Sequence, residues 1–142
     1  MIDYRSLDKI YHSEGIKECI INGRIPYELI AGVILEPIQG EGGYIFGKKE
    51  WLLNVQKECN DLGISLIADE IQTFARTGKT FAFENFNIQP DIIAISKSSV
   101  LGITMASLKY EEAMNLGWHS CTWGGGKVLD NNIAWTTGLA PY

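Results

Sequence analysis

The chain has few cysteines, few histidines and no long apolar run. Its three cysteines, Cys19, Cys59 and Cys121, are scattered along the sequence, which is typical of reduced thiols in the cytoplasm and not of a disulfide framework. Neither of its two histidines lies near a cysteine at a zinc-ligand spacing, so the sequence predicts no metal site. The longest uncharged apolar run, Leu29–Leu35, is far shorter than the roughly 20 residues that a membrane span needs. We therefore expect a cytoplasmic protein with no membrane span.

Basic residues are also scarce relative to acidic ones. The chain has 12 lysines and arginines against 17 aspartates and glutamates, a net charge of −5, which argues against a surface for nucleic acid or anionic membranes. Apolar residues, in contrast, make up 46% of the 142 residues. This is enough for the core of one domain, and the chain is too short for two.

Three short apolar runs predict buried strands. Each run is rich in β-branched residues and shows no polar alternation; the runs span residues 31–35, 64–68 and 91–95. This pattern is typical of strands that are buried on both faces of a parallel sheet. A further strand is expected over residues 103–108.

The segment between the first two runs predicts a helix over Lys48–Leu62. Its apolar residues share one helical face: Trp51, Leu52, Val55, Cys59 and Leu62. Gly63 follows where a helix C-cap is expected. Weaker helical patterns cover residues 11–21, 110–116 and 128–137. Because strands and helices alternate, we expect an α/β fold.

Several predicted strands end in residues that suit cofactor chemistry. Glu36 follows the first apolar run, Asp69 the second and Lys97 the third, and the carboxyl ends of parallel strands form the edge where α/β sheets bind ligands. Taken alone, each is more often a solvated charge at a strand end. Together, a partly desolvated lysine can form a Schiff base with an aldehyde, and a carboxylate can keep a pyridine ring protonated. A lysine and a carboxylate of this kind are the smallest set of side chains that pyridoxal phosphate chemistry requires.

The motifs around this pair are specific to one family. Residues 33–43 read VILEPIQGEGG, residues 67–73 read IADEIQT, residues 76–78 read RTG and residues 90–97 read PDIIAISK. In this order they resemble the motifs of class III pyridoxal-phosphate-dependent aminotransferases, which include 4-aminobutyrate, ornithine and acetylornithine aminotransferases. The resemblance covers about residues 29–135. It implies that residues 1–142 form a single, incomplete large domain of fold type I, a mostly parallel sheet flanked by helices.

The resemblance also implies roles for individual residues. Lys97 matches the lysine that forms the Schiff base with the cofactor and then moves the substrate proton, and Asp69 matches the carboxylate beside the pyridinium nitrogen. Gln72 would lie beside the phenolic oxygen of the cofactor. Glu41 matches a glutamate that pairs with a substrate-binding arginine. Thr122 resembles a threonine that reaches the cofactor phosphate of a neighbouring subunit, which implies a homo-oligomer with shared active sites.

The activity that the resemblance implies is transfer of an amino group. The donor would be an ω-amino acid such as 4-aminobutyrate or ornithine, and the acceptor a 2-oxo acid. A related pyridoxal-phosphate-dependent decarboxylase or aminomutase stays open as an alternative. So does a non-catalytic remnant, or a subunit fragment that needs a complementary chain, because the family's phosphate-binding and substrate-arginine segments have no counterpart here. We therefore expect weak cofactor binding and little turnover from the isolated chain.

The sequence departs from the family pattern at three places. A glycine expected after Thr73 is absent, so Asp69 and Lys97 are 28 residues apart, one fewer than the usual family spacing. The loop between two strands can absorb this deletion, which can redirect Gln72 and Arg76. The second departure is at residues 98–102, which read SSVLG where the family has a glycine-rich turn. The third is at residues 124–127, which read GGGK where the family has GGNP.

Overall fold

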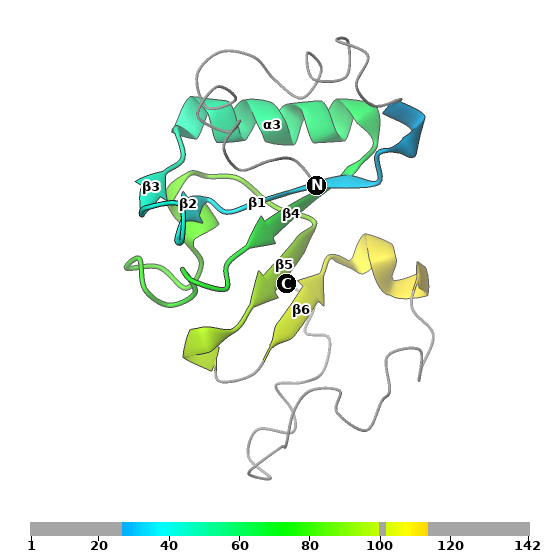
Figure 1. The fold of residues 1–142 in the computed structure, drawn as a ribbon. Helices are drawn as coiled ribbons and strands as arrows, with labels where there is room; N and C mark the ends of the chain where they lie inside the picture. Colours follow the sequence, from blue (N-terminus) through cyan, green and yellow to red (C-terminus); the bar gives the residue numbers. More distant parts are fainter. Residues whose placement is uncertain (1–26, 100–101, 114–142) are drawn as a thin grey trace, which may run out of the picture.

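The computed structural model describes residues 27–99 and 102–113 (Figure 1). Its centre is a four-stranded sheet in the order β1-β4-β5-β6. The strands are β1 (Gly32–Leu35), β4 (Ser65–Asp69), β5 (Ile92–Ile95) and β6 (Ile103–Ala106). The helices predicted over residues 11–21 and 128–137 lie outside the described residues, as does Thr122.

Three of the four strands run parallel. β1 pairs with β4 and β4 with β5 in parallel, whereas β6 pairs with β5 in the antiparallel direction. The three apolar runs of the sequence are therefore strands, and the mostly parallel sheet of an α/β fold is confirmed. The strand predicted over residues 103–108 ends earlier, at Ala106, because a 3-10 helix, η5 (Leu108–Ala113), follows it.

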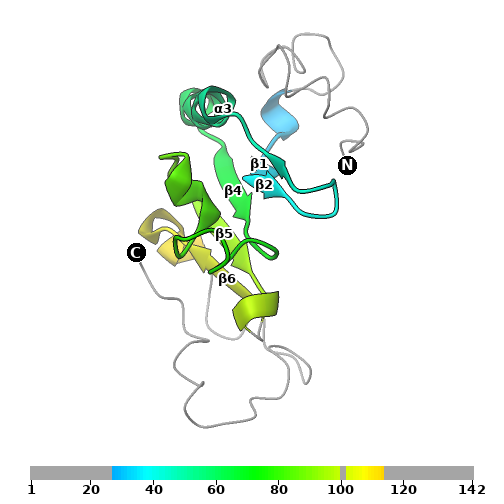
Figure 2. The same cartoon turned by 90° about the vertical axis from the view of Figure 1, so that its left-hand side faces the viewer.

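One α-helix, α3 (Lys49–Leu62), lies along one side of the sheet (Figures 1 and 2). The predicted apolar face is confirmed, since Leu52, Val55 and Cys59 are completely buried. Gly63 ends the helix in the left-handed conformation with φ 67°, and its N–H is directed to carbonyl oxygens of the last turn. Helix α3 thus joins the parallel strands β1 and β4 as a βαβ unit.

The two faces of the sheet differ in burial. Val33 and Leu35 pack against the cluster that Leu66 forms with α3, whereas Ile34 between them is 64% exposed. Ile67, the register partner of Ile34, is half-buried. The apolar runs predicted burial of both faces, but within the described ranges a helix covers only one. The difference arises because α3 is the only α-helix in this part of the chain.

Two clusters of buried side chains form the core. One consists of Val55, Cys59, Ile64 and Leu66, and the other of Ile38, Leu52, Ala82, Phe86 and Ile88. Burial, together with the negative charges of Asp91 and Glu58, raises the pKa of the Cys59 thiol to about 11. Cys59 is therefore a protonated, apolar core residue at neutral pH.

A small hairpin and several short helical turns were not predicted. β2 (Ile38–Gln39) pairs antiparallel with β3 (Ile45–Phe46), and the turn between them contains Gly43 at φ 113°. The other turns are 3-10 helices: η2 (Tyr27–Leu29), η3 (Ala82–Asn85) and η4 (Lys97–Ser99). Within the described ranges, every helix is too short or too polar to span a bilayer.

Candidate functional site

Asp69 and Lys97 lie at the same edge of the sheet, on adjacent parallel strands. Asp69 is the last residue of β4, and its register partner is Ala94 of β5. Lys97 comes three residues after Ala94, at the start of η4, which lies at the tip of β5 (Figure 1). The sequence predicted a carboxylate and an amine at the carboxyl edge of the sheet, and in the structure Asp69 and Lys97 lie at this edge.

Asp69 presents a partly open carboxylate. Strand alternation puts its side chain on the same face as Ile67, the face that α3 does not cover. One carboxylate oxygen, Oδ1, accepts a hydrogen bond from the backbone N–H of Ile71 at 3.0 Å. Among the described residues, the other oxygen has no hydrogen-bond partner. The carboxylate is thus oriented by the backbone and keeps an oxygen for a ligand.

Lys97 is exposed and has an uncommon backbone conformation. Its φ is 52°, in the left-handed region that side chains other than glycine rarely adopt. The turn is closed by a hydrogen bond from Ser99 N–H to the Ser96 carbonyl at 3.3 Å. Strain of this kind is found at functional sites where the surrounding structure holds it, and it sets the direction in which the lysine leaves the sheet edge.

Gln72 and Glu41 contact each other, although 31 residues separate them in the sequence. The Gln72 side-chain amide donates a hydrogen bond to Glu41 Oε1 at 2.7 Å. Gly40 makes this approach possible, because a Cβ at position 40 would lie 2.5 Å from Gln72 Cδ. The structure therefore brings together two of the predicted site residues, one from the β2–β3 turn and one from the loop after β4.

Arg76 extends this contact to the loop that carries Lys97. Its Nε donates to Ser98 Oγ at 2.8 Å, and its Nη1 donates to the Gln72 carbonyl at 3.2 Å. Hydrogen bonds thus run from Glu41 through Gln72 and Arg76 to Ser98. This chain crosses three loops at the carboxyl edge and ends beside Lys97.

The sequence motifs predicted no functional role for Arg76 or Ser98. The sequence did carry a signal for Arg76, which stands in the RTG motif, but its partner lies 22 residues away. Ser98 stands where the family has a glycine-rich turn, but this difference did not point to Arg76 as its partner. The other predicted site residue, Thr122, lies outside the described residues.

Two other carboxylates at strand ends hold the fold instead of facing a ligand. Glu70 is completely buried and accepts hydrogen bonds from Ala82 N–H at 3.0 Å and Phe83 N–H at 2.9 Å, and also from the Thr73 hydroxyl. Glu36, after β1, accepts a hydrogen bond from Gly40 N–H at 2.7 Å. The Glu70 carboxylate therefore caps the first N–H groups of helix η3, and the Glu36 carboxylate orients the backbone at the start of the β2–β3 turn.

The opposite edge of the sheet is closed by its own contacts. The Asp91 carboxylate accepts a hydrogen bond from the Leu66 N–H at 2.8 Å and forms an ion pair with Lys109. The hydroxyl groups of Ser65 and Tyr110 are also hydrogen-bonded to each other. These contacts attach η5 to the amino ends of β4 and β5, so this edge has a structural role.

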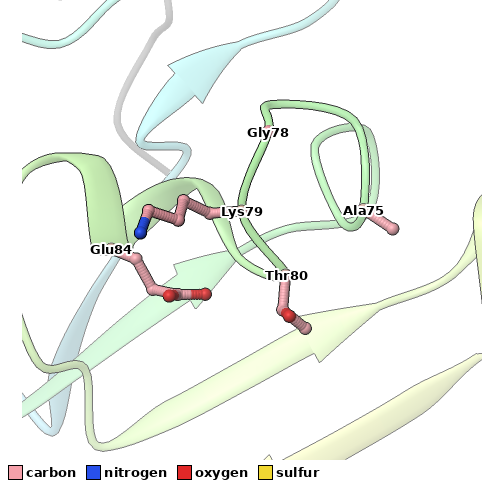
Figure 3. A pocket seen from close by; sticks show the side chains of 5 residues that line it. All are labelled: Ala75, Gly78, Lys79, Thr80 and Glu84. Carbon is pink, nitrogen blue, oxygen red and sulfur yellow. The ribbon is translucent and has the colours of Figure 1, made fainter.

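The described residues also form a shallow hollow of about 470 Å³ between the loop at Ala75–Thr80 and η3 (Figure 3). Lys79, Thr80 and Glu84 supply its polar side chains. None of the predicted site residues lines it, so it is separate from the Asp69 and Lys97 edge. The described residues contain no group of His, Cys, Asp or Glu side chains placed to hold a metal ion.

The groups at the carboxyl edge fit the cofactor that the sequence resemblance implies. Pyridoxal phosphate requires an amine for its aldehyde, a carboxylate for its ring nitrogen and a donor for its phenolic oxygen. Lys97 would supply the amine, Asp69 the carboxylate and Gln72 the donor. The free oxygen of Asp69 and the exposed Lys97 amine leave these atoms accessible to the cofactor.

Known proteins with similar sequences are aminotransferases. Residues 8–135 match the family described as Aminotransferase class-III. A probable 4-aminobutyrate aminotransferase from Bacillus subtilis is 46% identical over 82 residues, which is 57% of this chain and 19% of that protein. An acetylornithine aminotransferase from Methanosarcina acetivorans is 43% identical over 104 residues, 71% of this chain and 26% of that protein. The chain therefore spans 19–26% of the length of these two relatives.

A similar solved structure gives the same result. The lysine aminotransferase from M. tuberculosis superposes with a TM-score of 0.59 at 33% identity. The superposition covers 66% of this chain and 23% of that enzyme. The sheet and its helix thus match part of a longer chain.

Proposed function

Because the chain belongs to the class III aminotransferase family, we propose that it carries the cofactor-binding lysine and aspartate of a pyridoxal-phosphate-dependent transaminase. The observation that carries this proposal is the placement of Asp69 and Lys97 at one edge of the sheet, after adjacent parallel strands. The amino donor is an ω-amino acid such as 4-aminobutyrate or ornithine, and the acceptor is a 2-oxo acid. The names of the similar 4-aminobutyrate and acetylornithine aminotransferases support this substrate class.

Lys97 and Asp69 divide the chemistry between them. When bound, pyridoxal phosphate supplies an aldehyde and a pyridine ring that withdraws electrons from the reacting carbon. Lys97 Nζ would hold the cofactor through its aldehyde, and once the substrate amine has displaced it, the free amine would serve as the base that moves the proton of the substrate carbon. Asp69 keeps the ring nitrogen protonated, and its hydrogen bond from Ile71 N–H holds the carboxylate in one orientation.

Gln72 and Glu41 serve the cofactor and the substrate. Gln72 would lie beside the phenolic oxygen of the cofactor, and its amide donates a hydrogen bond to Glu41. Glu41 pairs with a substrate-binding arginine from another part of the protein and releases it when a substrate carboxylate needs it. By the resemblance, Thr122 would contact the cofactor phosphate in a neighbouring subunit, which would make the active protein a homodimer.

The whole reaction is proposed for a protein that includes more than these residues. The chain spans 19% and 26% of the two aminotransferases compared above. Residues 1–142 form one incomplete large domain in this proposal. For this reason the first test measures attachment of the cofactor and not turnover.

The proposal predicts that pyridoxal phosphate attaches to Lys97 in preference to other exposed lysines. The purified chain is mixed with the cofactor and reduced with borohydride, which makes the attachment permanent, and the labelled peptide is identified by mass spectrometry. Lys97→Arg should abolish this label. Asp69→Asn should lower the apparent affinity at least tenfold, because a hydrogen bond to a charged group contributes about 1.5–3 kcal/mol.

Lys79→Arg is the matched control, because Lys79 is also exposed and lies on a nearby loop. It should leave the label on Lys97 unchanged. Equal labelling of all exposed lysines, or no labelling, would contradict the proposal and favour a non-catalytic remnant. Amine transfer from 4-aminobutyrate or ornithine by a complete protein would support transaminase chemistry, whereas release of carbon dioxide would indicate a decarboxylase.

A further inference from the structure

We propose that Arg76 is a positioning residue that holds the Lys97 turn in its reactive orientation. The inference rests on the proposed function, because the lysine that Arg76 positions is the proposed cofactor-binding residue. Arg76 itself touches neither Asp69 nor Lys97 in the described contacts. It acts through Ser98, the next residue after Lys97.

The first argument is the geometry of the guanidinium group. Arg76 Nε donates to Ser98 Oγ at 2.8 Å, and Arg76 Nη1 donates to the Gln72 carbonyl at 3.2 Å. The two acceptors belong to the loops after β4 and β5, which carry the two halves of the site. A planar guanidinium with several fixed donors can bridge two such acceptors, whereas a lysine ammonium is a single point of attachment.

The second argument is the conformation of the turn that Arg76 holds. Lys97 has a positive φ of 52°, and such a conformation costs free energy for a residue with a side chain. Lys97 and Ser98 are both exposed, so burial does not hold them. The hydrogen bond from Arg76 comes from outside the turn and favours this conformation over more relaxed ones.

The third argument is that Arg76 also affects the other half of the site. Its second hydrogen bond fixes the backbone of Gln72, whose side chain holds Glu41 at 2.7 Å. Arg76 is in turn fixed by the loop, since its N–H donates to the Thr73 carbonyl at 3.0 Å. Loss of the guanidinium should therefore loosen the Lys97 turn while β4, β5 and α3 remain folded.

The test is proteolysis of the full chain with an endoproteinase that cleaves only after lysine. Cleavage after Lys97 reports how often the turn opens, and cleavage after Lys57 and Lys79 reports opening elsewhere. In Arg76→Gln and Ser98→Ala, cleavage after Lys97 relative to Lys57 should rise about fivefold, the change expected for the loss of one ordinary hydrogen bond.

Thr77→Ala is the matched control. It removes a hydrogen bond from Asn85 at 3.2 Å in the same loop but leaves the Lys97 turn intact, so cleavage after Lys97 should match that of the unaltered chain. The proposal is overturned if cleavage after Lys97 is unchanged in Arg76→Gln and Ser98→Ala. It is also overturned if cleavage rises equally at all lysines, because Arg76 would then only stabilise the fold.

Cofactor trapping separates this inference from the proposed function. If Lys97 is the cofactor lysine, Arg76→Gln should slow its labelling by pyridoxal phosphate and borohydride about fivefold, with no change in the final extent of labelling. If the unaltered chain takes no label while cleavage after Lys97 still rises in the variants, Arg76 holds the turn and the proposed function fails. If the chain is labelled and Arg76→Gln changes neither the rate nor the cleavage, the positioning role fails alone.

Discussion

Two neighbouring carboxylates at the end of β4 have different roles because their side chains face different surroundings. Asp69 is half-buried on the face that α3 leaves uncovered, and accepts one backbone hydrogen bond. Glu70 is completely buried and accepts hydrogen bonds from three donors. A carboxylate surrounded by its own protein's donors has no capacity left for a ligand. Asp69 is therefore the residue suited to a cofactor, and Glu70 is part of the scaffold.

Glu70→Gln should destabilise the fold by about 2–3 kcal/mol. The amide replaces an acceptor oxygen with an NH₂ group, which leaves a buried backbone N–H without a partner. Urea denaturation followed by circular dichroism measures the free energy of unfolding. Glu50→Gln is the control, because Glu50 is exposed in the first turn of α3, and its loss should cost less than about 0.5 kcal/mol. Equal effects of the two substitutions would show that Glu70 is not a structural anchor.

At the scale of elements, the end of α3 depends on one glycine. Gly63 has φ 67°, and a Cβ added there would meet no atom within 4 Å. The cost of Gly63→Ala is therefore conformational, and it should lower the free energy of unfolding by about 1 kcal/mol. The control is Gly102→Ala, because position 102 is equally open but has no positive φ. It should leave thermal stability unchanged or slightly raised, and a matching loss in both variants would contradict this explanation.

The elements differ in how well the sequence predicted them. β1, β4 and β5 are apolar and rich in β-branched residues, and α3 repeats its apolar residues with the period of a helix, so local pattern was sufficient. β2 and β3 have two residues each, too few for any period. The link from Gln72 to Glu41 spans 31 residues, and that from Arg76 to Ser98 spans 22. Such contacts depend on how loops meet at the sheet edge, which single-sequence patterns do not show.

At the scale of the whole molecule, apolar side chains are exposed on β1 and on the β2–β3 hairpin that follows it. Among the described strands, β1 is at the edge of the sheet, and its Ile34 is 64% exposed. On the neighbouring hairpin, Tyr44 and Phe46 are 76% and 69% exposed. Strands in parallel sheets are normally covered on both faces, and an unpaired edge strand can pair with another chain. The exposed apolar side chains of β1 and the hairpin therefore favour association of the chain with another molecule.

We expect the isolated chain to self-associate as its concentration rises, because association buries Ile34 and the edge of β1. Ile34→Lys should weaken this association about tenfold or more, since burial of an isoleucine side chain contributes about 1.5–3 kcal/mol and a charge on an edge strand opposes pairing. Analytical ultracentrifugation over a range of concentrations measures the effect. Asn60→Lys adds the same charge on the exposed side of α3 and should change nothing. A chain that stays monomeric at every concentration would show that the exposed face of β1 does not drive association.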